Sequence, residues 1–319
     1  MTATTLTTTT LGQSDLNATR LIYGCMRIVG TWNPQEVDTD RRARAKASIA
    51  AAVDAGYTHF DHADIYCRGM CEQVFGEFLG ESPGLRQRIT ITTKCGIRFA
   101  GDPGKDSPHR YDFSPQHILA SAEASLKRLG VDTIDCYLLH RPDVLMHPEQ
   151  IAGAFDQLHR QGKVRHFGVS NFTIAQLTCL QSALDQPLVC NQIAFHPNRF
   201  AALEDDTLHE LHRLRVTPTA WSPVGGGMFA TGGRVPSDHP DRERLEGLLN
   251  VLDAEAERLG TNRTAVTLAW LMRHPACVHP IIGTTNAERI REAVTADTLA
   301  LDRDAWYRIY LAARGRKLP

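Results

Sequence analysis

The sequence predicts an α/β protein folded as a (β/α)8 TIM barrel, with an N-terminal hairpin or arm and additional C-terminal helices. Short runs rich in Val, Ile, Leu and Tyr alternate with longer amphipathic stretches, as in βα units around a parallel sheet. Eight such units fit the 319 residues, whereas a doubly wound sheet usually has about five or six strands. No linker, low-complexity segment or internal repeat divides the chain. We therefore expect one domain over residues 1–319, with about 1–17 as an N-terminal arm.

The strands are predicted from the apolar runs themselves. In chain order they are 20–25, 57–60, 89–93, 133–139, 164–169, 188–193, 216–220 and 277–282. Helical patterns lie between them, for example at 43–56, 114–130 and 147–162. Ser114 followed by Pro115 is typical of a helix start, and Gly130 and Gly162 are typical of helix ends. One additional helix is expected between Val235 and Gly260, and a terminal helix at 301–315.

The charge balance limits the classes of partner. Lys and Arg number 35 against 36 Asp and Glu, which gives a formal net charge of -1. No basic face for nucleic acid or anionic lipid is indicated, and a small neutral substrate is favoured. The Thr-rich start has neither the basic residues nor the apolar stretch of a signal peptide, and no later run is long enough to span a membrane. We expect a soluble, cytoplasmic protein, with a monomer favoured over an oligomer.

The cysteine and histidine patterns indicate no metal. None of the eight cysteines forms a close CxxC pair, so reduced thiols are expected. Cys67 and Cys71 flank a turn that contains glycine; a redox-sensitive pair is conceivable there, but two unrelated thiols are preferred. The 14 histidines show no HExxH motif.

Four polar residues near the ends of predicted strands indicate a candidate catalytic site. Asp61, Lys94 and His140 each follow an apolar strand run, and Tyr66 lies five residues beyond Asp61. Active sites of such barrels lie at the carboxyl ends of the strands, so the four side chains are expected to converge. A nearby ammonium lowers the pKa of a tyrosine, which predicts that Lys94 makes Tyr66 a better acid. Asp61 would keep the ammonium charged, and His140 would donate to a substrate oxygen or relay a proton.

Seven ordered motifs carry a family resemblance over essentially the whole chain. They are FDHADIY, ITTKCG, YLLHRP, GVSNF, NQIAFHP, TAWSPVGGG and PIIGTTNAERI. In this order they resemble the aldo-keto reductase superfamily, and most closely its bacterial YdhF-like oxidoreductases. The resemblance implies a catalytic tetrad of Asp61, Tyr66, Lys94 and His140. It also implies hydride transfer from a nicotinamide to an aldehyde or ketone, with Tyr66 as the general acid.

The predicted coenzyme site lies in the second half of the chain. No G-x-G-x-x-G motif follows the first strand, so a Rossmann mode of binding is not supported. The resemblance implies that Ser170, Asn171 and Gln192 hold the carboxamide and that Trp221 stacks on the nicotinamide. The loop of Ser222, Pro223, Gly225, Gly226 and Gly227 is expected to approach the pyrophosphate.

The adenosine end of the coenzyme is expected at 283–289. Thr284, Thr285 and Arg289 lie where a helix begins, and an arginine there suits the 2′-phosphate of NADPH. Gly283 stands where many NADPH-preferring relatives have lysine. NADPH is thus predicted, with NADH as the less favoured alternative.

The substrate region is the least defined, and two other functions stay open. Met26, Arg27 and Trp32 are candidate substrate contacts, and loop 98–113 has the composition of a mobile rim. The first alternative is a non-catalytic, cofactor-sensing regulatory barrel, against which the complete tetrad argues. The second is a lyase or aldolase that uses Lys94 as a Schiff base.

Overall fold

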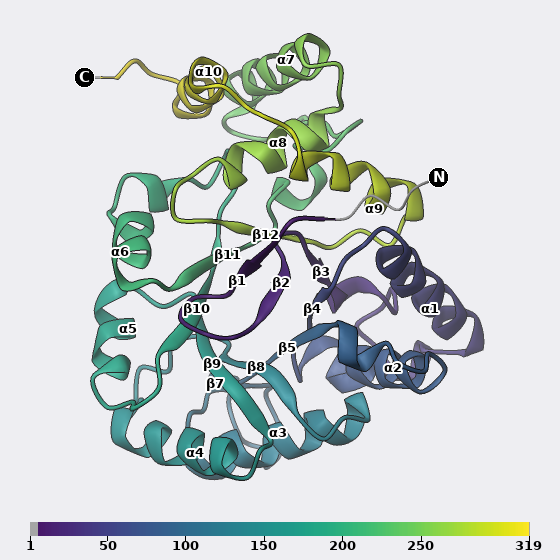
Figure 1. The fold of residues 1–319 in the computed structure, drawn as a ribbon, viewed down its shortest axis with the longest axis vertical. Helices are drawn as coiled ribbons and strands as arrows, with labels where there is room; N and C mark the ends of the chain where they lie inside the picture. The colour runs from purple at the N-terminus through teal and green to yellow at the C-terminus, as the bar shows by residue number, and fades with distance from the viewer. Residues whose placement is uncertain (1–5, 319) are drawn as a thin grey trace.

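The protein is described by a computed structural model that covers residues 6–318, and it is a closed barrel of eight parallel strands (Figure 1). The strand order around the barrel is β10-β11-β12-β3-β4-β5-β8-β9. The strands are β3 (Ile22–Gly24), β4 (His59–Asp61), β5 (Thr90–Cys95), β8 (Ile134–Leu139), β9 (Val164–Ser170), β10 (Leu188–Ala194), β11 (Thr217–Trp221) and β12 (His279–Ile282). The predicted fold class is confirmed.

Helices form the outer layer, as Figure 1 shows. They are α1 (Thr39–Asp54), α2 (Met70–Gly80), α3 (Pro115–Leu129), α4 (Pro148–Arg160), α5 (Ile174–Gln181), α6 (Thr207–Leu214), α7 (Arg242–Arg258), α8 (Arg263–Met272), α9 (Ala287–Val294) and α10 (Arg303–Arg314). Helices α7 and α10 pack against each other and are the two additional helices that the sequence predicted.

The predicted helix signals act at the expected places. The Ser114 hydroxyl accepts a hydrogen bond from the His117 amide, with Pro115 in the first turn of α3. Gly130 ends α3 in the left-handed conformation, at φ +65°. Gly162, at φ +69°, follows the end of α4 in the same way. These local signals fix helix boundaries because they satisfy amides and carbonyls that lack a partner within the helix.

The strand ends differ from the prediction at two residues that matter for the site. Lys94 was expected just after its strand but lies inside β5, and Asp61 is the last residue of β4. The backbone of both residues is therefore held by the strand ladder, because Asp61 pairs with Thr92 of β5 and Lys94 pairs with Leu138 of β8. The difference arises because polar residues can continue a strand when neighbouring strands bond to their backbone, which an apolar run does not reveal.

The N-terminal segment closes one end of the barrel (Figure 1). Strands β1 (Thr8–Thr10) and β2 (Asn17–Thr19) form an antiparallel hairpin. Its apolar side chains join residues that lie inside the barrel in one buried cluster: Leu11, Leu16, Cys136, Leu138, Val189 and Cys190. Gly12 is required in this turn, since a Cβ there would lie 2.3 Å from the Val189 carbonyl oxygen.

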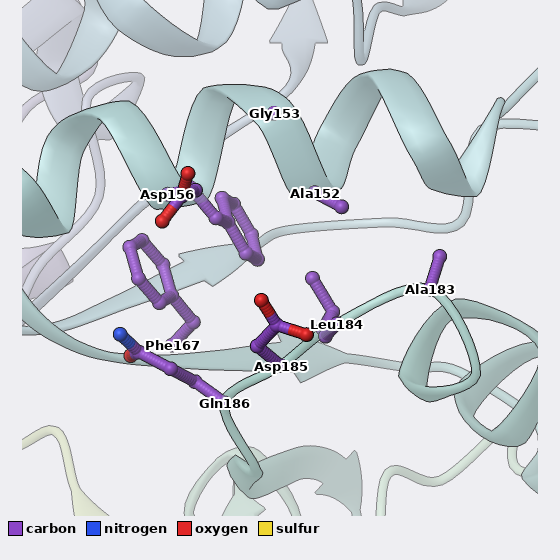
Figure 2. A pocket seen from close by; sticks show the side chains of 9 residues that line it. Ala152, Gly153, Asp156, Phe167, Ala183, Leu184, Asp185 and Gln186 are labelled. Carbon is purple, nitrogen blue, oxygen red and sulfur yellow. The ribbon is translucent and has the colours of Figure 1, made fainter.

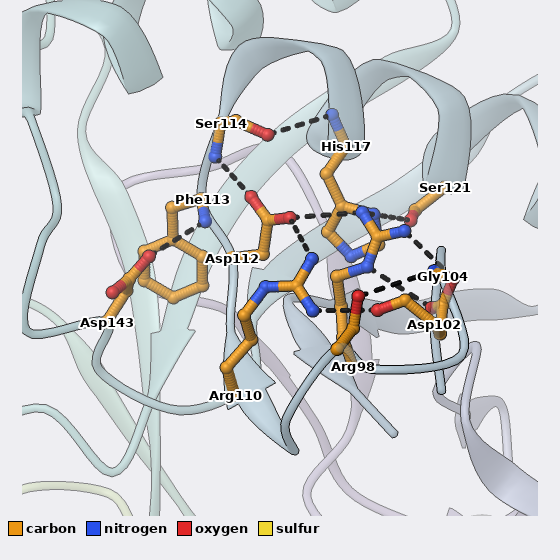
Figure 3. Close-up of polar contacts among 11 residues, drawn as sticks. Arg98, Asp102, Gly104, Arg110, Asp112, Phe113, Ser114, His117, Ser121 and Asp143 are labelled. Atoms are coloured by element: carbon orange, nitrogen blue, oxygen red, sulfur yellow. Dashed lines mark hydrogen bonds and ion pairs between the residues drawn. The ribbon is translucent and has the colours of Figure 1, made fainter. Parts of the chain in front are cut away.

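Loop 98–113 contains a small hairpin. Strand β6 (Ile97–Arg98) pairs antiparallel with β7 (Arg110–Tyr111). Arg98 binds Asp102 at 2.9 Å and Asp112 at 3.0 Å, while Arg110 donates to the Asp102 carbonyl at 2.7 Å (Figure 3). These contacts give the predicted rim a defined structure, which the Gly- and Pro-rich composition did not indicate.

Two features that would indicate other functions, a membrane-spanning helix and a metal-binding cluster, are absent from residues 6–318. No helix in this range is long and apolar enough to cross a membrane. The same residues contain no group of three or more His, Cys, Asp or Glu side chains arranged for a metal ion. All eight cysteines, Cys67 and Cys71 included, are free thiols.

Candidate active site

A cavity of about 460 Å³ opens at the carboxyl ends of the barrel strands. It brings together residues from all eight barrel strands or the segments that follow them, as expected for this fold. Its lining residues are Gly24, Met26, Arg27, Trp32, Asp61, Ile65, Tyr66, Ile97, His140, Arg141, Ser170, Asn171, Gln192, Trp221, Ser222, Pro223, Val224, Gly226, Gly227, Ala230, Thr264, Ile281, Ile282, Gly283, Thr284 and Arg289.

The Lys94 ammonium forms hydrogen bonds with two other predicted catalytic residues, Asp61 and Tyr66. Its Nζ donates to Asp61 Oδ2 at 2.7 Å and to Tyr66 Oη at 3.2 Å. A third bond goes to the His62 carbonyl oxygen at 2.6 Å. Lys94 is completely buried and does not line the cavity, so it acts on the cavity only through its neighbours. Tyr66 begins a short 3-10 turn, Tyr66–Gly69, between β4 and α2.

The pKa of Tyr66 differs from the prediction. Burial raises this pKa to about 12, and the Lys94 ammonium lowers it by less than burial raises it. The expected net decrease was wrong because burial of the phenol disfavours its charged form. Burial also acts to lower the pKa of Lys94, but Asp61 and Tyr66 oppose this and hold that pKa above its usual value. At neutral pH the site therefore contains an ammonium beside a neutral phenol.

His140 faces Tyr66 across the cavity wall. The two rings are 5.9 Å apart between centroids, at an interplanar angle of 80°. Burial, with the nearby charges of Lys94 and Arg141, holds the pKa of His140 well below its usual value. The imidazole is thus neutral at pH 7, with one N–H available to a ligand. Its Nδ1 is buried and has no hydrogen-bond partner in the described structure.

A chain of polar side chains crosses the ends of β9, β10 and β11. Ser170 donates to the Gln192 carbonyl at 3.0 Å, and Asn171 Nδ2 donates to the Ser170 hydroxyl at 2.8 Å. The Trp221 indole donates to Asn171 Oδ1 at 2.9 Å. Gln192 Nε2 donates to Asp61 Oδ1 at 2.9 Å, which links this chain to the Lys94 cluster. All four predicted residues line the cavity.

Backbone conformation at this edge is unusual for the residue types. Asn171 has φ +61° and Ser222 has φ +51°, both in the left-handed region that favours glycine. Such conformations cost energy and are often found at ligand sites.

The remaining predicted coenzyme residues divide into two groups. Pro223, Gly226, Gly227, Gly283, Thr284 and Arg289 line the cavity, whereas Gly225 and Thr285 are not part of its lining. A Cβ at Gly225 would lie 2.7 Å from the Phe229 ring, so this glycine is explained by packing of the turn. Asn286, which was not predicted, caps α9 by accepting from the Glu288 and Arg289 amides.

Sequence reasoning missed several residues of the cavity wall. Ile97, Ala230 and Thr264 come from separate segments of the chain outside the quoted motifs, and Ile65 is an apolar residue of FDHADIY directly before Tyr66. Arg141, which directly follows His140 in YLLHRP, had an available signal because it is a charged residue at the same strand end.

A second, smaller cavity of about 200 Å³ lies between α4 and the segment before β10 (Figure 2). Phe155 and Phe167 border it, and their rings stack at 3.9 Å between centroids. Its two carboxylates come from Asp156, which pairs with Arg160, and from Asp185. None of the predicted site residues lies there.

The sequence is similar to known proteins over most of its length. The sequence model of the Aldo/keto reductase family matches residues 20–312. Uncharacterized oxidoreductase YcsN of Bacillus subtilis (strain 168) is 41% identical, over 96% of this chain and 97% of its own length. Oxidoreductase YdhF of Escherichia coli (strain K12) is 42% identical, over 92% of this chain and 94% of its own. A 6-dehydroglucose reductase of Agrobacterium fabrum is 38% identical, over 95% and 97%.

The fold is also found among solved structures. Glycerol dehydrogenase AKR11B4 from Gluconobacter oxydans aligns with a TM-score of 0.84 at 22% sequence identity. The alignment covers 100% of this chain and 98% of that one. At this identity the likeness supports the barrel architecture alone.

Proposed function

The chain belongs to the aldo/keto reductase family, and on this basis we propose that it reduces an aldehyde or ketone to an alcohol with NADPH, using Tyr66 as the general acid. It is an NAD(P)H-dependent oxidoreductase that acts on small carbonyl compounds. The finer assignments to NADPH and to Tyr66 are our proposal. The observation that carries the assignment of Tyr66 is the contact of the Lys94 ammonium with both Asp61 and Tyr66, beside a cavity that Tyr66 and His140 line.

The cavity has the chemistry that a nicotinamide dinucleotide requires. Its volume and its long wall suit an elongated ligand, and amide and hydroxyl groups gather at the end near Asp61. Ser170, Asn171 and Gln192 are proposed to hold the carboxamide, with Trp221 stacking on the ring. Ser222, Pro223, Gly226 and Gly227 would lie along the pyrophosphate, whose close approach glycine permits.

The proposed preference for NADPH depends on Arg289. Its side chain is exposed at the start of α9 and has no carboxylate partner within residues 6–318. Thr284 and Gly283 line the cavity beside it, and Thr285 lies between them and the helix. A free guanidinium at this place suits a 2′-phosphate, which NADH lacks.

The residues around Tyr66 can supply and replace one proton. When bound, the coenzyme supplies the hydride that reduces the carbonyl carbon. His140, which is neutral, donates an N–H to the carbonyl oxygen and orients it. The neutral Tyr66 phenol transfers its proton to that oxygen as negative charge develops there, since an alkoxide is much more basic than a phenolate. Lys94 then stabilises the phenolate until solvent returns the proton, and Asp61 keeps Lys94 charged.

Replacement of Tyr66 by phenylalanine tests this proposal. Tyr66→Phe should reduce kcat with a reactive aldehyde by about 100-fold or more, the usual contribution of a general acid, while leaving the Kd for NADPH within about twofold. Fluorescence titration of bound NADPH and initial rates at 340 nm provide the two measurements. Unchanged turnover would exclude Tyr66 as the acid.

The same preparation distinguishes the two alternatives. A regulatory barrel would bind NADPH without oxidising it in the presence of any carbonyl compound tested. A Schiff-base enzyme would form a borohydride-trapped adduct on Lys94. The three hydrogen bonds of the buried Lys94 ammonium argue against this second alternative, because a nucleophilic amine must be neutral and accessible.

A further inference from the structure

The part of the cavity around Tyr66 and His140 contains two arginines, whereas the chain as a whole has a formal net charge of -1. We call this part the substrate end. It is defined by six residues that line the cavity beside the two proposed catalytic groups: Met26, Arg27, Trp32, Ile65, Ile97 and Arg141. Four of these six are apolar, and the two charged ones are both arginines. The Trp32 and Tyr66 rings lie 6.4 Å apart between centroids, which places an apolar wall beside the phenol.

Neither arginine of the substrate end has a counter-ion in the described structure. Arg27 and Arg141 form no salt bridge and no side-chain hydrogen bond within residues 6–318. The Arg141 guanidinium lies over the Trp221 ring, 5.5 Å from its centroid, and the Arg199 guanidinium lies at the same distance from that ring. By contrast, the partly buried Arg128 binds Glu72 at 2.7 Å, and Arg98 binds two aspartates.

Three carboxylates of this part of the chain have other partners. Asp61 accepts from Lys94 through Oδ2 and from Gln192 through Oδ1. Asp143, two residues after Arg141, accepts from the Phe113 and Leu145 amides. Glu36 accepts from the Thr31 hydroxyl and the Asn33 amide group. The substrate end therefore has positive charge that no protein carboxylate compensates.

The proposed coenzyme phosphates do not account for Arg141. The pyrophosphate and 2′-phosphate are assigned to the segments after β11 and β12, which contain Gly226 and Arg289. Arg141 instead follows β8, and its guanidinium lies 5.5 Å from the centroid of the Trp221 ring, which is proposed to stack on the nicotinamide at the reacting end of the coenzyme. It also directly follows His140, the residue proposed to bind the carbonyl oxygen.

We propose that the substrate carries a carboxylate in addition to its reactive carbonyl group, and that Arg141 binds this carboxylate. The guanidinium fork matches the two carboxylate oxygens, and the Trp221 face supports its plane. Arg27 adds positive charge at the same end of the cavity and favours entry of an anion. This inference depends on the proposed function, because it assumes that the reacting carbonyl lies between Tyr66 and His140. The net charge of -1 does not oppose it, since a sum over the chain contains no information about one cavity.

The test compares substrates that differ in a single charge. Rates with NADPH are measured for 4-carboxybenzaldehyde and for its neutral methyl ester, and for succinic semialdehyde and neutral butyraldehyde. For the unmodified protein, kcat/KM should be about 10-fold or more higher for the carboxylate of each pair. In Arg141→Gln this ratio should fall by about 10- to 100-fold, which is the usual effect of losing a charge-assisted hydrogen bond.

Two further variants separate a specific contact from a change of net charge or of catalysis. Arg44→Gln removes an exposed arginine of α1 that has no partner in the described chain, and it should leave the ratio unchanged. Arg141→Lys keeps the charge but not the fork, and it should give an intermediate ratio. A general effect on His140 would change both members of each pair equally, so the ratio is insensitive to it.

The outcomes are distinguishable from failure of the proposed function. Equal kcat/KM for both members of each pair, or an unchanged ratio in Arg141→Gln, would overturn the carboxylate assignment while carbonyl reduction stands. Preference for a neutral hydroxyl-rich aldehyde such as glyceraldehyde over every carboxylate would also overturn it. If no carbonyl compound oxidises NADPH, the proposed function itself is wrong.

Discussion

Replacement of Asp61 by asparagine is expected to destabilise the protein strongly at neutral pH. Asp61→Asn preserves the side-chain volume but removes the charge that lies 2.7 Å from the buried Lys94 ammonium. Loss of one partner of a buried ion pair typically costs about 3–5 kcal/mol. Deprotonation of the lysine sets an upper limit, because neutralising an amine of pKa ~10.4 at pH 7 costs about 4.6 kcal/mol. We therefore expect the free energy of unfolding to fall by about 3–4.6 kcal/mol at pH 7.

The pH dependence gives this prediction a sign that can be checked. Without Asp61, burial dominates and lowers the pKa of Lys94 in the folded state below its unfolded value. The unfolded variant then binds more protons than the folded one, so its stability rises with pH between the two pKa values. The destabilisation should shrink by up to about 1.4 kcal/mol per pH unit as the pH rises toward 10.

Urea denaturation of both proteins at pH 7, 8 and 9 measures this difference. Asp156→Asn is the matched control, because Asp156 pairs with Arg160 at the surface and the two side chains are 48% and 69% exposed. Surface pairs contribute about 0–1 kcal/mol, so this control should change little at any of the three pH values. A loss below 1 kcal/mol for Asp61→Asn, or a loss that does not vary with pH, would refute the reasoning about Lys94.

Three other predictions concern the coenzyme, the acid limit and the barrel interior. Arg289→Gln should raise the KM for NADPH by about 10- to 100-fold and leave that for NADH unchanged, and equal effects on both would remove the 2′-phosphate assignment. Burial lowers the pKa of His59, His62 and His279 to about 3. Folding therefore loses up to about 1.4 kcal/mol per histidine and pH unit below pH 6.5, which urea denaturation at pH 7.5 and 5.5 would detect; equal stability would contradict it. Gly168→Ala should cost about 1–3 kcal/mol in urea, because the added Cβ would meet atoms of β8 and β10 at 2.6–2.8 Å, and an unchanged midpoint would show that the barrel interior can adapt.

The helices and the order of the strands were predictable because their signals are local. The Ser114 cap, Gly130 and Gly162 satisfy groups only a few residues away, so they act in the same way whatever surrounds them. The strand of Lys94 was predicted to end two residues too early, since Lys94 and Cys95 do not extend its apolar run and only pairing with β8 continues it. The hairpin in loop 98–113 depends on ion pairs between residues up to 14 positions apart, and composition does not specify such pairs.

The sequence by itself determined the eight-stranded barrel, the residues at the strand ends and the family, because periodicity and ordered motifs are properties of the chain. Only the tertiary structure decided how those residues affect one another. Lys94 contacts Asp61 and Tyr66 across 33 and 28 positions. Burial, which depends on the whole assembled barrel, reversed the expected decrease in the pKa of Tyr66. The uncompensated charge of Arg141 likewise became visible only when its neighbours were in place, since desolvation and pairing are set by three-dimensional surroundings and not by residue type.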